Sequence, residues 1–581
     1  MPTTRLPDVQ DIGLINPSFF SIDEAAGDPA RLLSLGQVLL ARPLPDVASL
    51  RAWLRDWDDV SRLVWGHWGR VTLAMNRDTR DEALAAQHAS LQPALVQPWF
   101  ELADQLNARY LDHPLRDQVG DDLAILDARK QSQRDIYHAP NGPLFTRLSE
   151  LAANYQRRMG ETCVVLDGEA VPLSMARRKV NDPDRRVRES AWRAIGAAQA
   201  SLAADVSGIL DEMVVLRDQV ATNAGYPDFV AYHFAASGRT DYSPDDIERF
   251  SAEIAAVVVP RLQRLSERRR LRLGVDTLRP WDMPAPIIPS PSAEEAALFS
   301  SEAELFELTA QIMGDIDPRL QADFRVLQRH GLIDLMTRPG KAPGGYCMTV
   351  DDIGMPFIFA NLTGDWRDLQ VLFHEGGHAL HALACRTQPF GEYRNPAAEF
   401  CEVASMGLEL LAQERSSSLP ASVSRALELQ QLSGVFGLFL QVALVDGLQL
   451  WMYRNPDQGG AVRQQRWAER HARLFGTSTD WSGFEETRAV TWATIPHFFT
   501  HPLYFIEYGI AQLGALQLWQ RARRDMSGTV DRYRSALALG GSRSLSELFT
   551  AAGLTFSMEG ALLAELLDEV LDVIEQSLAA P

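Results

Sequence analysis

Long stretches of helical periodicity constrain this chain more than any other feature of its sequence. In these stretches apolar side chains recur at positions i, i+3, i+4 and i+7, the spacing that gathers them along one face of an α-helix. They cover residues 46–75, 80–112, 184–224, 243–272, 293–314, 365–386, 396–414, 421–455 and 558–579. So many amphipathic helices must bury their apolar faces against one another. We therefore predict a mainly α fold.

Strand signals are few and lie in two places. Residues 161–172 are expected to form a hairpin that turns at Asp167 and Gly168. Residues 336–362 are expected to form two short strands joined by loops rich in glycine and proline. Because this second stretch directly precedes the helical stretch 365–386, we expect one small β-sheet beside that helix.

The chain is long for a single domain. At about 150 residues per domain, 581 residues would form roughly four domains. Only one proline-rich stretch is visible, residues 279–292, and no internal repeat is found. We expect this stretch to cross the surface of one structure rather than to mark a domain boundary.

The charge of the chain excludes several classes of partner. It carries 56 basic and 76 acidic residues, a net charge of −20, and a field of that sign repels nucleic-acid phosphates and anionic lipid. The densest basic stretch, 266–272, lies in a helical pattern and is expected to be a solvated helix face. We therefore expect neither nucleic-acid nor membrane partners.

The sequence also favours a reducing compartment. Residues 1–20 lack the basic and apolar regions of a secretory signal. The most apolar window, 434–451, contains Gln441 and Asp446 and is expected to be a buried helix rather than a membrane span. The four cysteines show neither CxxC spacing nor disulfide density. We therefore expect a cytoplasmic location.

The strongest chemical signal is the sequence HEGGH at residues 374–378. Helical residues four apart lie about 6 Å apart on one side of the helix, so His374 and His378 can bind one zinc ion together. Glu375 lies where a carboxylate can take a proton from a water molecule at the metal. The two adjacent glycines each cost about 1 kcal/mol of helix stability relative to alanine. This cost indicates that another element packs against the helix backbone there.

A catalytic zinc ion needs a third protein ligand and one open position. His381 shares the face of the first two histidines, but it lies about 10 Å from His374 along the helix axis. We expect it to pack or support rather than to bind the same ion. Glu399 and Glu402 lie one turn apart on the next helical stretch, 396–414. Either can bind zinc, while the other accepts a hydrogen bond from a ligand imidazole.

A third group of interest is the segment 497–508, HFFTHPLYFIEY. Pro502 suits the first turn of a helix, which would place Tyr504 and Tyr508 on one face and His497 on the loop before it. Phenol and imidazole donors directed at one point can stabilise an oxyanion. An aromatic stripe packed into the core is the alternative interpretation.

Residues 338–346, RPGKAPGGY, form a loop rich in glycine. The order GxxxxGK[ST] of a phosphate-binding loop is absent. Glycines beside a strand permit another backbone to approach closely, here that of a bound peptide.

Lysine is rare in this chain. Only Lys130, Lys179 and Lys341 occur, so arginine supplies 53 of the 56 basic residues. Where arginine has replaced nearly every exchangeable lysine, a remaining lysine can mark a place that a guanidinium does not fit. Lys341, within the glycine-rich loop, is one such residue.

Four motifs together resemble the oligoendopeptidase F branch of the thimet oligopeptidase family, whose members are intracellular zinc metallopeptidases. The motifs are PGKAPGGYC, NLTGDWRDLQVLFHEGGHALH, EFCEVAS and HFFTHPLYFIEYGIAQLGALQLW, in the order and separation of that family. The likeness is strong from about residue 334 to 520, looser over 184–272 and faint before about 160.

The resemblance implies roles for individual residues. His374 and His378 match zinc ligands and Glu375 matches the general base. Glu402, in FCEVAS, matches the third ligand, which leaves Glu399 as a candidate hydrogen-bond partner of a ligand imidazole.

The same resemblance covers the groups that meet the substrate. His497, Tyr504 and Tyr508 match groups that bind substrate and stabilise the tetrahedral intermediate, and Gly344, Gly345 and Tyr346 match a substrate loop. The tyrosine spacing differs from that of thimet oligopeptidase itself, which leaves open which phenol contacts the oxyanion.

The implied protein is a cytoplasmic endopeptidase with one zinc ion per chain that cleaves internal bonds of short unfolded peptides. Its fold would be two helical lobes around a deep substrate channel. Residues 1–183 would form an N-terminal helical region that is part of one lobe, and residues 184–581 the catalytic region. The alternatives are a helical HExxH carboxypeptidase or dipeptidyl carboxypeptidase, and a peptide-binding scaffold without activity. The sequence does not indicate an oligomeric state.

Overall fold

The computed structural model describes residues 27–579 except 167 and 289, together with residues 6, 15 and 19–22. In this part of the chain the protein is mainly α-helical with two small β-sheets, which confirms the predicted fold class. The chain divides into two compact units, each made of three stretches. The first unit comprises residues 1–135, 292–424 and 514–556, and the second comprises residues 136–291, 425–513 and 557–581.

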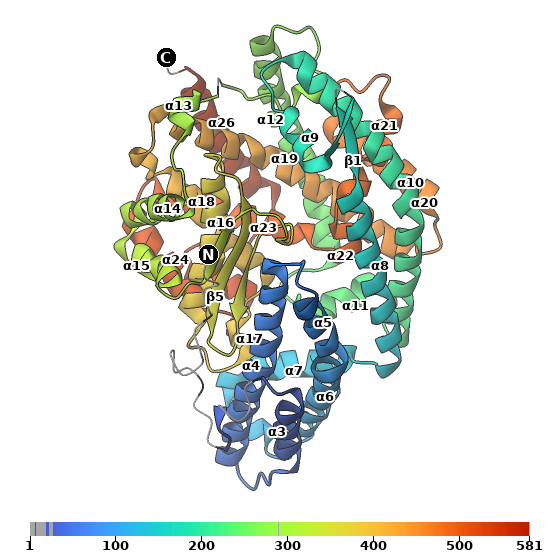
Figure 1. Ribbon diagram of the computed structural model, residues 1–581, viewed down its shortest axis with the longest axis vertical. Helices are drawn as coiled ribbons and strands as arrows, with labels where there is room; N and C mark the ends of the chain where they lie inside the picture. The colour runs from blue at the N-terminus through green and yellow to red at the C-terminus, as the bar shows by residue number, and fades with distance from the viewer. Residues whose placement is uncertain are drawn as a thin grey trace. The chain divides into compact units, whose positions relative to one another are not determined.

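The first unit contains a three-stranded sheet and helices that pack beside it (Figure 1). Its helices are α3 (Pro29–Ala41), α4 (Val47–Arg77), α5 (Glu82–Leu91), α6 (Gln97–Leu111), α7 (Ala124–Ile136), α13 (Ala293–Ala296), α14 (Glu302–Ile316), α15 (Pro318–Arg329), α16 (Asp368–Cys385), α17 (Gly391–Arg394), α18 (Ala398–Gln413), α24 (Met526–Leu539) and α25 (Leu545–Ala551). Short turns of other helix types are η1 (Gln92–Val96), η2 (Arg116–Gln118), η3 (Asp121–Leu123) and η6 (Ser416–Ser418).

The sheet of the first unit has the strand order β3-β5-β4. Its strands are β3 (Ile333–Met336), β4 (Tyr346–Val350) and β5 (Met355–Leu362). The central strand β5 runs parallel to β3 and antiparallel to β4. Helix α16 packs beside β5, as expected (Figure 1). The sequence predicted β4 and β5 but missed β3, because a parallel pairing leaves no hairpin signal in the sequence.

The second unit is built mainly from long helices. They are α8 (Gly142–Glu161), α9 (Leu173–Lys179), α10 (Arg185–Asn223), α11 (Phe229–Ala236), α12 (Pro244–Leu273), α19 (Ala421–Arg454), α20 (Gly460–Phe475), α21 (Glu485–Val490), α22 (His497–Thr500), α23 (Phe505–Ala522) and α26 (Gly560–Ala579), with η4 (Ala139–Asn141), η5 (Pro280–Asp282) and η7 (Thr491–Thr494). The unit boundary falls near the start of α19 and within α23. Strands β1 (Cys163–Leu166) and β2 (Glu169–Pro172) form the predicted hairpin. Of its turn, Gly168 has φ +86°, and Asp167 lies outside the described residues.

Most predicted helices are present, and their differences have local causes. The stretch 80–112 is not one helix, because the π-helical turn η1 separates α5 from α6. Pro93 in η1 and Pro98 in the first turn of α6 lack the N–H that a continuous α-helix requires. The motif-bearing helix α16 begins at Asp368 rather than at Asp365. The Asp368 carboxylate accepts hydrogen bonds from the amides of residues 363–365 and so fixes the preceding loop.

The expectation for the proline-rich stretch 279–292 is wrong. The second unit ends at residue 291 and the first resumes at residue 292, so this stretch ends at a boundary between compact units. The division at residue 183 concerns the extent of the catalytic region and stays a prediction.

One described helix, α19, has the length and apolar composition of a membrane-spanning helix. In its most apolar window 72% of the residues are buried inside the protein, as in a core helix. Most residues of the predicted stretch 434–451 are buried too, which agrees with the prediction of a buried helix.

Candidate metal centre

The HEGGH motif lies in the middle of α16, where α18 crosses it. A side-chain carbon added at Gly377 would lie 2.5 Å from the Ser405 Cα and 2.6 Å from the Ala404 carbonyl oxygen of α18. At Gly376 the same atom would lie 2.8 Å from the methyl group of Met313. This confirms that another element packs against the glycine pair. Only glycine permits the two helix backbones to approach so closely.

The crossing brings three predicted ligands together. The Oε2 atom of Glu402 lies 3.6 Å from the His374 Nε2 atom and 3.7 Å from the His378 Nε2 atom. The three ligand atoms all lie within 4.8 Å of one another. Tetrahedral zinc, with bonds of about 2.0–2.1 Å, places its ligand atoms roughly 3.4 Å apart. The two histidines and the carboxylate therefore fit a zinc ion with one position left open.

Hydrogen bonds orient these ligands. The His374 Nδ1 atom lies 2.7 Å from the Glu409 Oε1 atom, which leaves Nε2 for a metal. Gln370 donates to the other carboxylate oxygen of Glu409 at 3.0 Å. Ser405 donates to the Glu402 Oε2 atom at 3.0 Å. At His374, Glu409 takes the place that the sequence analysis gave to Glu399.

Glu399 lies in the first turn of α18 and is buried, and its role stays a prediction. The sequence could have indicated Glu409, because it lies seven residues after Glu402 and so shares its helix face.

Burial and mutual charge perturb the pKa values of the motif. Burial lowers the pKa of His374, but the hydrogen bond and charge of Glu409 more than offset this effect and raise it to about 9. Burial and the neighbouring charge of His374 lower the pKa of His378 to about 3. Burial raises the pKa of the Glu375 carboxyl to about 7, and the charges of Glu402 and Glu409 add to that effect. Such perturbed titratable groups are typical of functional sites.

Glu375 lies beside the glycine-rich loop. The Cys347 backbone N–H donates a hydrogen bond to its carboxylate, whereas its buried Oε2 atom has no hydrogen-bond partner among the described residues. A side-chain carbon added at Gly345 would lie 3.8 Å from Glu375 Oε1. The hydroxyl of Tyr346 accepts a hydrogen bond from Asn76 at 2.8 Å. The structure therefore brings the predicted substrate loop next to the predicted general base.

His381 is not one of the ligands that the structure brings together. Its ring is 2% exposed and meets the ring of Phe400 edge to face, with 5.9 Å between centroids. Burial lowers the pKa of His381 to about 4. It is a packing residue of α16, as expected from its distance along the helix.

His497, Tyr504 and Tyr508 belong to the second unit and form a cluster of their own. The His497 Nε2 atom lies 3.4 Å from the Tyr508 hydroxyl, and the two tyrosine rings have centroids 5.2 Å apart. The predicted helix start at Pro502 is wrong. His497 opens the short helix α22, and α23 begins only at Phe505.

Leu503 explains the later start of α23. Its φ is +57°, the left-handed region that a side chain disfavours. Its N–H donates to the Gln449 side chain at 2.9 Å, and its carbonyl accepts from Arg239 at 2.8 Å. Arg239 also forms a buried ion pair with Glu507. Both backbone groups of this strained residue are therefore held by side chains from elsewhere in the second unit.

Arg217 holds the beginning of the same segment. Its guanidinium donates to the carbonyls of Phe498 and Phe499, each at 2.7 Å, and to the Tyr453 hydroxyl at 2.6 Å. Arg217 is 4% exposed. The sequence did not indicate this role of Arg217, because its acceptors include backbone carbonyls, which no sequence motif records.

Comparisons with known proteins show which family the chain belongs to. The model of the family described as peptidase family M3 matches residues 180–567. The oligoendopeptidase F homolog of Borreliella burgdorferi is 22% identical over 340 residues, which cover 54% of this chain and 55% of that protein. Oligopeptidase PepF of Bacillus subtilis is 21% identical over 328 residues, which cover 55% of this chain and 48% of that protein. The chain thus spans about half the length of the curated relatives it matches.

Solved structures extend the likeness over nearly the whole chain. A crystal structure named for oligoendopeptidase F has a TM-score of 0.85 and 26% identity to this protein, and the match covers 95% of this chain and 98% of that one.

Proposed function

Because the chain belongs to peptidase family M3, we propose that it is a zinc-dependent endopeptidase that hydrolyses internal bonds of short unfolded peptides. The observation that carries the proposal is the convergence of His374, His378 and Glu402 beside the carboxylate of Glu375. Two neutral imidazoles and one carboxylate form the donor set of catalytic zinc in peptidases.

The residues of this site have distinct tasks. His374, His378 and Glu402 would hold one zinc ion, which when bound supplies the positive charge that polarises a water molecule and the scissile carbonyl. Glu375 takes the proton of the attacking water and then passes it to the leaving amine. The N–H of Cys347 holds one side of the carboxylate and leaves Oε2 available.

Three further roles are part of the proposal. His497, Tyr504 and Tyr508 supply donors to the oxyanion, a role supported by the likeness of segment 497–508 to the family motif. Gly344 and Gly345 offer backbone to a peptide. The cytoplasm is the proposed location, supported by four free cysteines.

The experiment that tests the proposal is a mass spectrum of the products from an unstructured nine-residue peptide, recorded with and without a zinc chelator. We expect internal cleavage that the chelator abolishes and added zinc restores. The Glu375→Gln protein, with its zinc content measured, is the matched control for a contaminating peptidase.

Two outcomes would redirect the proposal. Release of only one or two C-terminal residues would favour the alternative of a carboxypeptidase or dipeptidyl carboxypeptidase. An intact peptide in the presence of a full equivalent of bound zinc would contradict the proposed activity and favour a peptide-binding scaffold.

A further inference from the structure

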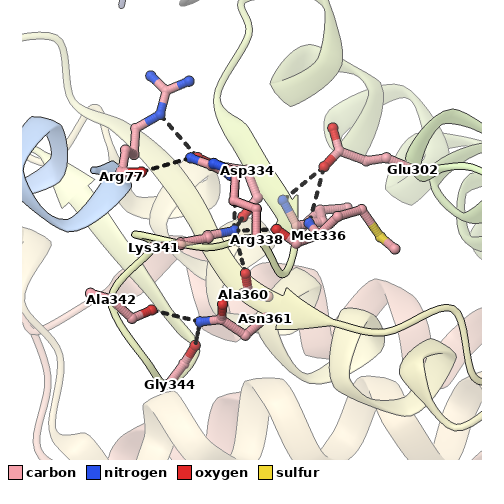
Figure 2. Close-up of polar contacts among 11 residues, drawn as sticks. Arg77, Glu302, Asp334, Met336, Arg338, Lys341, Ala342, Gly344, Ala360 and Asn361 are labelled. Atoms are coloured by element: carbon pink, nitrogen blue, oxygen red, sulfur yellow. Dashed lines mark hydrogen bonds and ion pairs between the residues drawn. The ribbon is translucent and has the colours of Figure 1, made fainter. Parts of the chain in front are cut away.

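The glycine-rich loop is attached to the sheet of the first unit by one buried ammonium group. The side chain of Lys341 is fully buried. Its Nζ atom donates to the Asp334 carbonyl and to the Asp334 Oδ1 atom, each at 2.8 Å, and to the Met336 carbonyl at 3.1 Å. A fourth oxygen, the carbonyl of Ala360 in β5, also accepts from it. Figure 2 shows these acceptors around the ammonium group.

Asp334 supplies the opposite charge and links Lys341 to α4. Arg77, the last residue of α4, donates to its carboxylate at 3.0 Å, and Arg338 donates to both carboxylate oxygens (Figure 2). Arg338 also donates to the Arg77 carbonyl at 2.9 Å. One buried carboxylate thus connects strand β3, the end of α4 and the loop.

The loop is held along its length by further hydrogen bonds. Thr79 donates twice to the Gly340 carbonyl, and the Ala342 N–H donates to the Asn76 carbonyl at 2.8 Å. The side chain of Asn361 donates to the carbonyls of Ala342 and Gly344, each at 2.7 Å (Figure 2). Beyond this point the chain continues into β4 and passes Glu375. The attachment at Lys341 therefore fixes the backbone that lies beside the general base.

We propose that Lys341 is a positioning residue for peptide binding: its ammonium group joins the ends of β3 and β5 and thereby fixes the backbone of residues 344–346. This inference rests on the proposed function, because the loop matters to catalysis only if a peptide binds beside it. Lys341 does not touch the reacting atoms itself. It acts through the loop.

Arginine cannot replace lysine here. Four oxygens surround a single nitrogen, which suits a compact ammonium with three donors, whereas a guanidinium is planar and presents five donors in a rigid fork. The Lys341 side chain is fully buried, so a longer side chain could not extend into solvent. This explains why a chain that uses arginine for nearly every basic residue has kept lysine at position 341.

Lys130 provides a matched control. It is the other buried lysine of the first unit, and it pairs with Glu392 and lies over the ring of Trp57 at 3.8 Å. Neither partner belongs to the metal ligands or to the loop. Lys130→Met therefore removes a buried ammonium and its ion pair without disturbing residues 338–350.

The experiment compares Lys341→Met, Lys341→Arg and Lys130→Met with the wild-type protein by peptide-hydrolysis kinetics, bound zinc and hydrogen exchange of residues 338–350. We expect both Lys341 variants to raise KM by roughly tenfold or more, with smaller changes in kcat, because a displaced loop weakens peptide binding. Exchange in residues 338–350 should become roughly tenfold faster. Lys130→Met should change neither KM nor this exchange, although it lowers thermal stability.

Several results would overturn the inference. Wild-type KM and wild-type exchange in Lys341→Met, or full function in Lys341→Arg, would each contradict it. If Lys341→Met does not fold, Lys341→Gln, whose neutral amide can be buried more easily, gives the same comparison. If the wild-type protein cleaves no peptide, the proposed function fails, whereas the exchange measurement still decides whether Lys341 fixes the loop.

Discussion

The crossing of α16 and α18 in the first unit and the segment 497–508 in the second unit hold their candidate functional side chains in different ways. At the crossing, the candidate ligands project from regular helices at fixed spacing, and Gly377 permits the close contact that brings Glu402 to the histidines. The segment 497–508 is irregular. It contains the left-handed Leu503, and buried arginines hold its backbone carbonyls.

The difference shows how irregular backbone can be made precise. A helix satisfies its own hydrogen bonds, so its side-chain geometry follows from sequence spacing. A loop leaves its carbonyls for other partners. In the second unit Arg217 and Arg239 donate to such carbonyls. At the glycine-rich loop the buried cation, Lys341, belongs to the loop itself and donates to carbonyls of strands β3 and β5. In both units a buried cation thus attaches a predicted substrate-binding segment to its surroundings by donating to backbone carbonyls.

The largest expected effects concern the crossing. Glu375→Gln should retain zinc yet reduce kcat by roughly a thousandfold or more, because the proton acceptor is lost while the ligands remain. Glu402→Ala should instead lose the metal, since two histidines alone do not complete the site. Metal analysis alongside peptide hydrolysis separates the two. Full zinc occupancy in Glu402→Ala would return Glu399 to consideration as the third ligand.

A second prediction asks whether the segment 497–508 takes part in catalysis. Tyr508→Phe should lower kcat by roughly a hundredfold or more with little change in KM, because a donor to the oxyanion acts mainly in the transition state. Tyr504→Phe removes a neighbouring phenol of the same cluster and is the matched comparison. Equal and small effects of both changes would indicate that the cluster is an aromatic packing group.

A third prediction concerns the contact between the helices. Gly377→Ala should destabilise the protein by about 1–3 kcal/mol or more, because the added carbon would lie 2.5 Å from the Ser405 Cα. Gly434→Ala, in the interior of α19, meets nothing within 4 Å and should be stabilising by about 1 kcal/mol. Thermal melts of both variants give the comparison. Similar stability changes in the two variants would mean that α18 does not pack closely against α16 at Gly377.

The last prediction concerns the pH dependence of the free energy of unfolding that comes from Asp334, which binds Lys341 of the glycine-rich loop. Burial raises the pKa of Asp334, but hydrogen bonds from Arg338 and Lys341 outweigh it and lower the pKa from 3.8 to about 2. Because its pKa is lower in the folded state, the Asp334 carboxylate stabilises the folded protein above about pH 4 by about 2 kcal/mol. This contribution is lost as the pH falls through about 2. Urea unfolding of the wild-type protein and of the Asp334→Asn variant between pH 2 and 5 measures this contribution. The same pH slope in both proteins would contradict the assignment.

The candidate metal site could be predicted from the sequence because its geometry depends mostly on residues close together in the chain. His374 and His378 are four residues apart on one helix, and the glycine pair already indicated a crossing element. The residues alone did not choose between Glu399 and Glu402. That choice depends on which turn of α18 lies over Gly377, a matter of packing between two helices that sequence spacing does not define.

Tertiary structure alone decided the parts of the protein that depend on distant contacts. Strand β3, the hydrogen bond from Glu409 to His374 and the later start of α23 all depend on pairings between separate stretches of the chain. The roles of Arg217 and Lys341 do so as well, because their acceptors are backbone carbonyls, which look alike at every position of a sequence. Periodicity, composition and spacing determined the helices, the candidate zinc motif and the observation that lysine is rare. Only the folded chain decided which oxygen atoms accept hydrogen bonds from which cations. A buried cation without such acceptors would be costly, so burial requires these contacts.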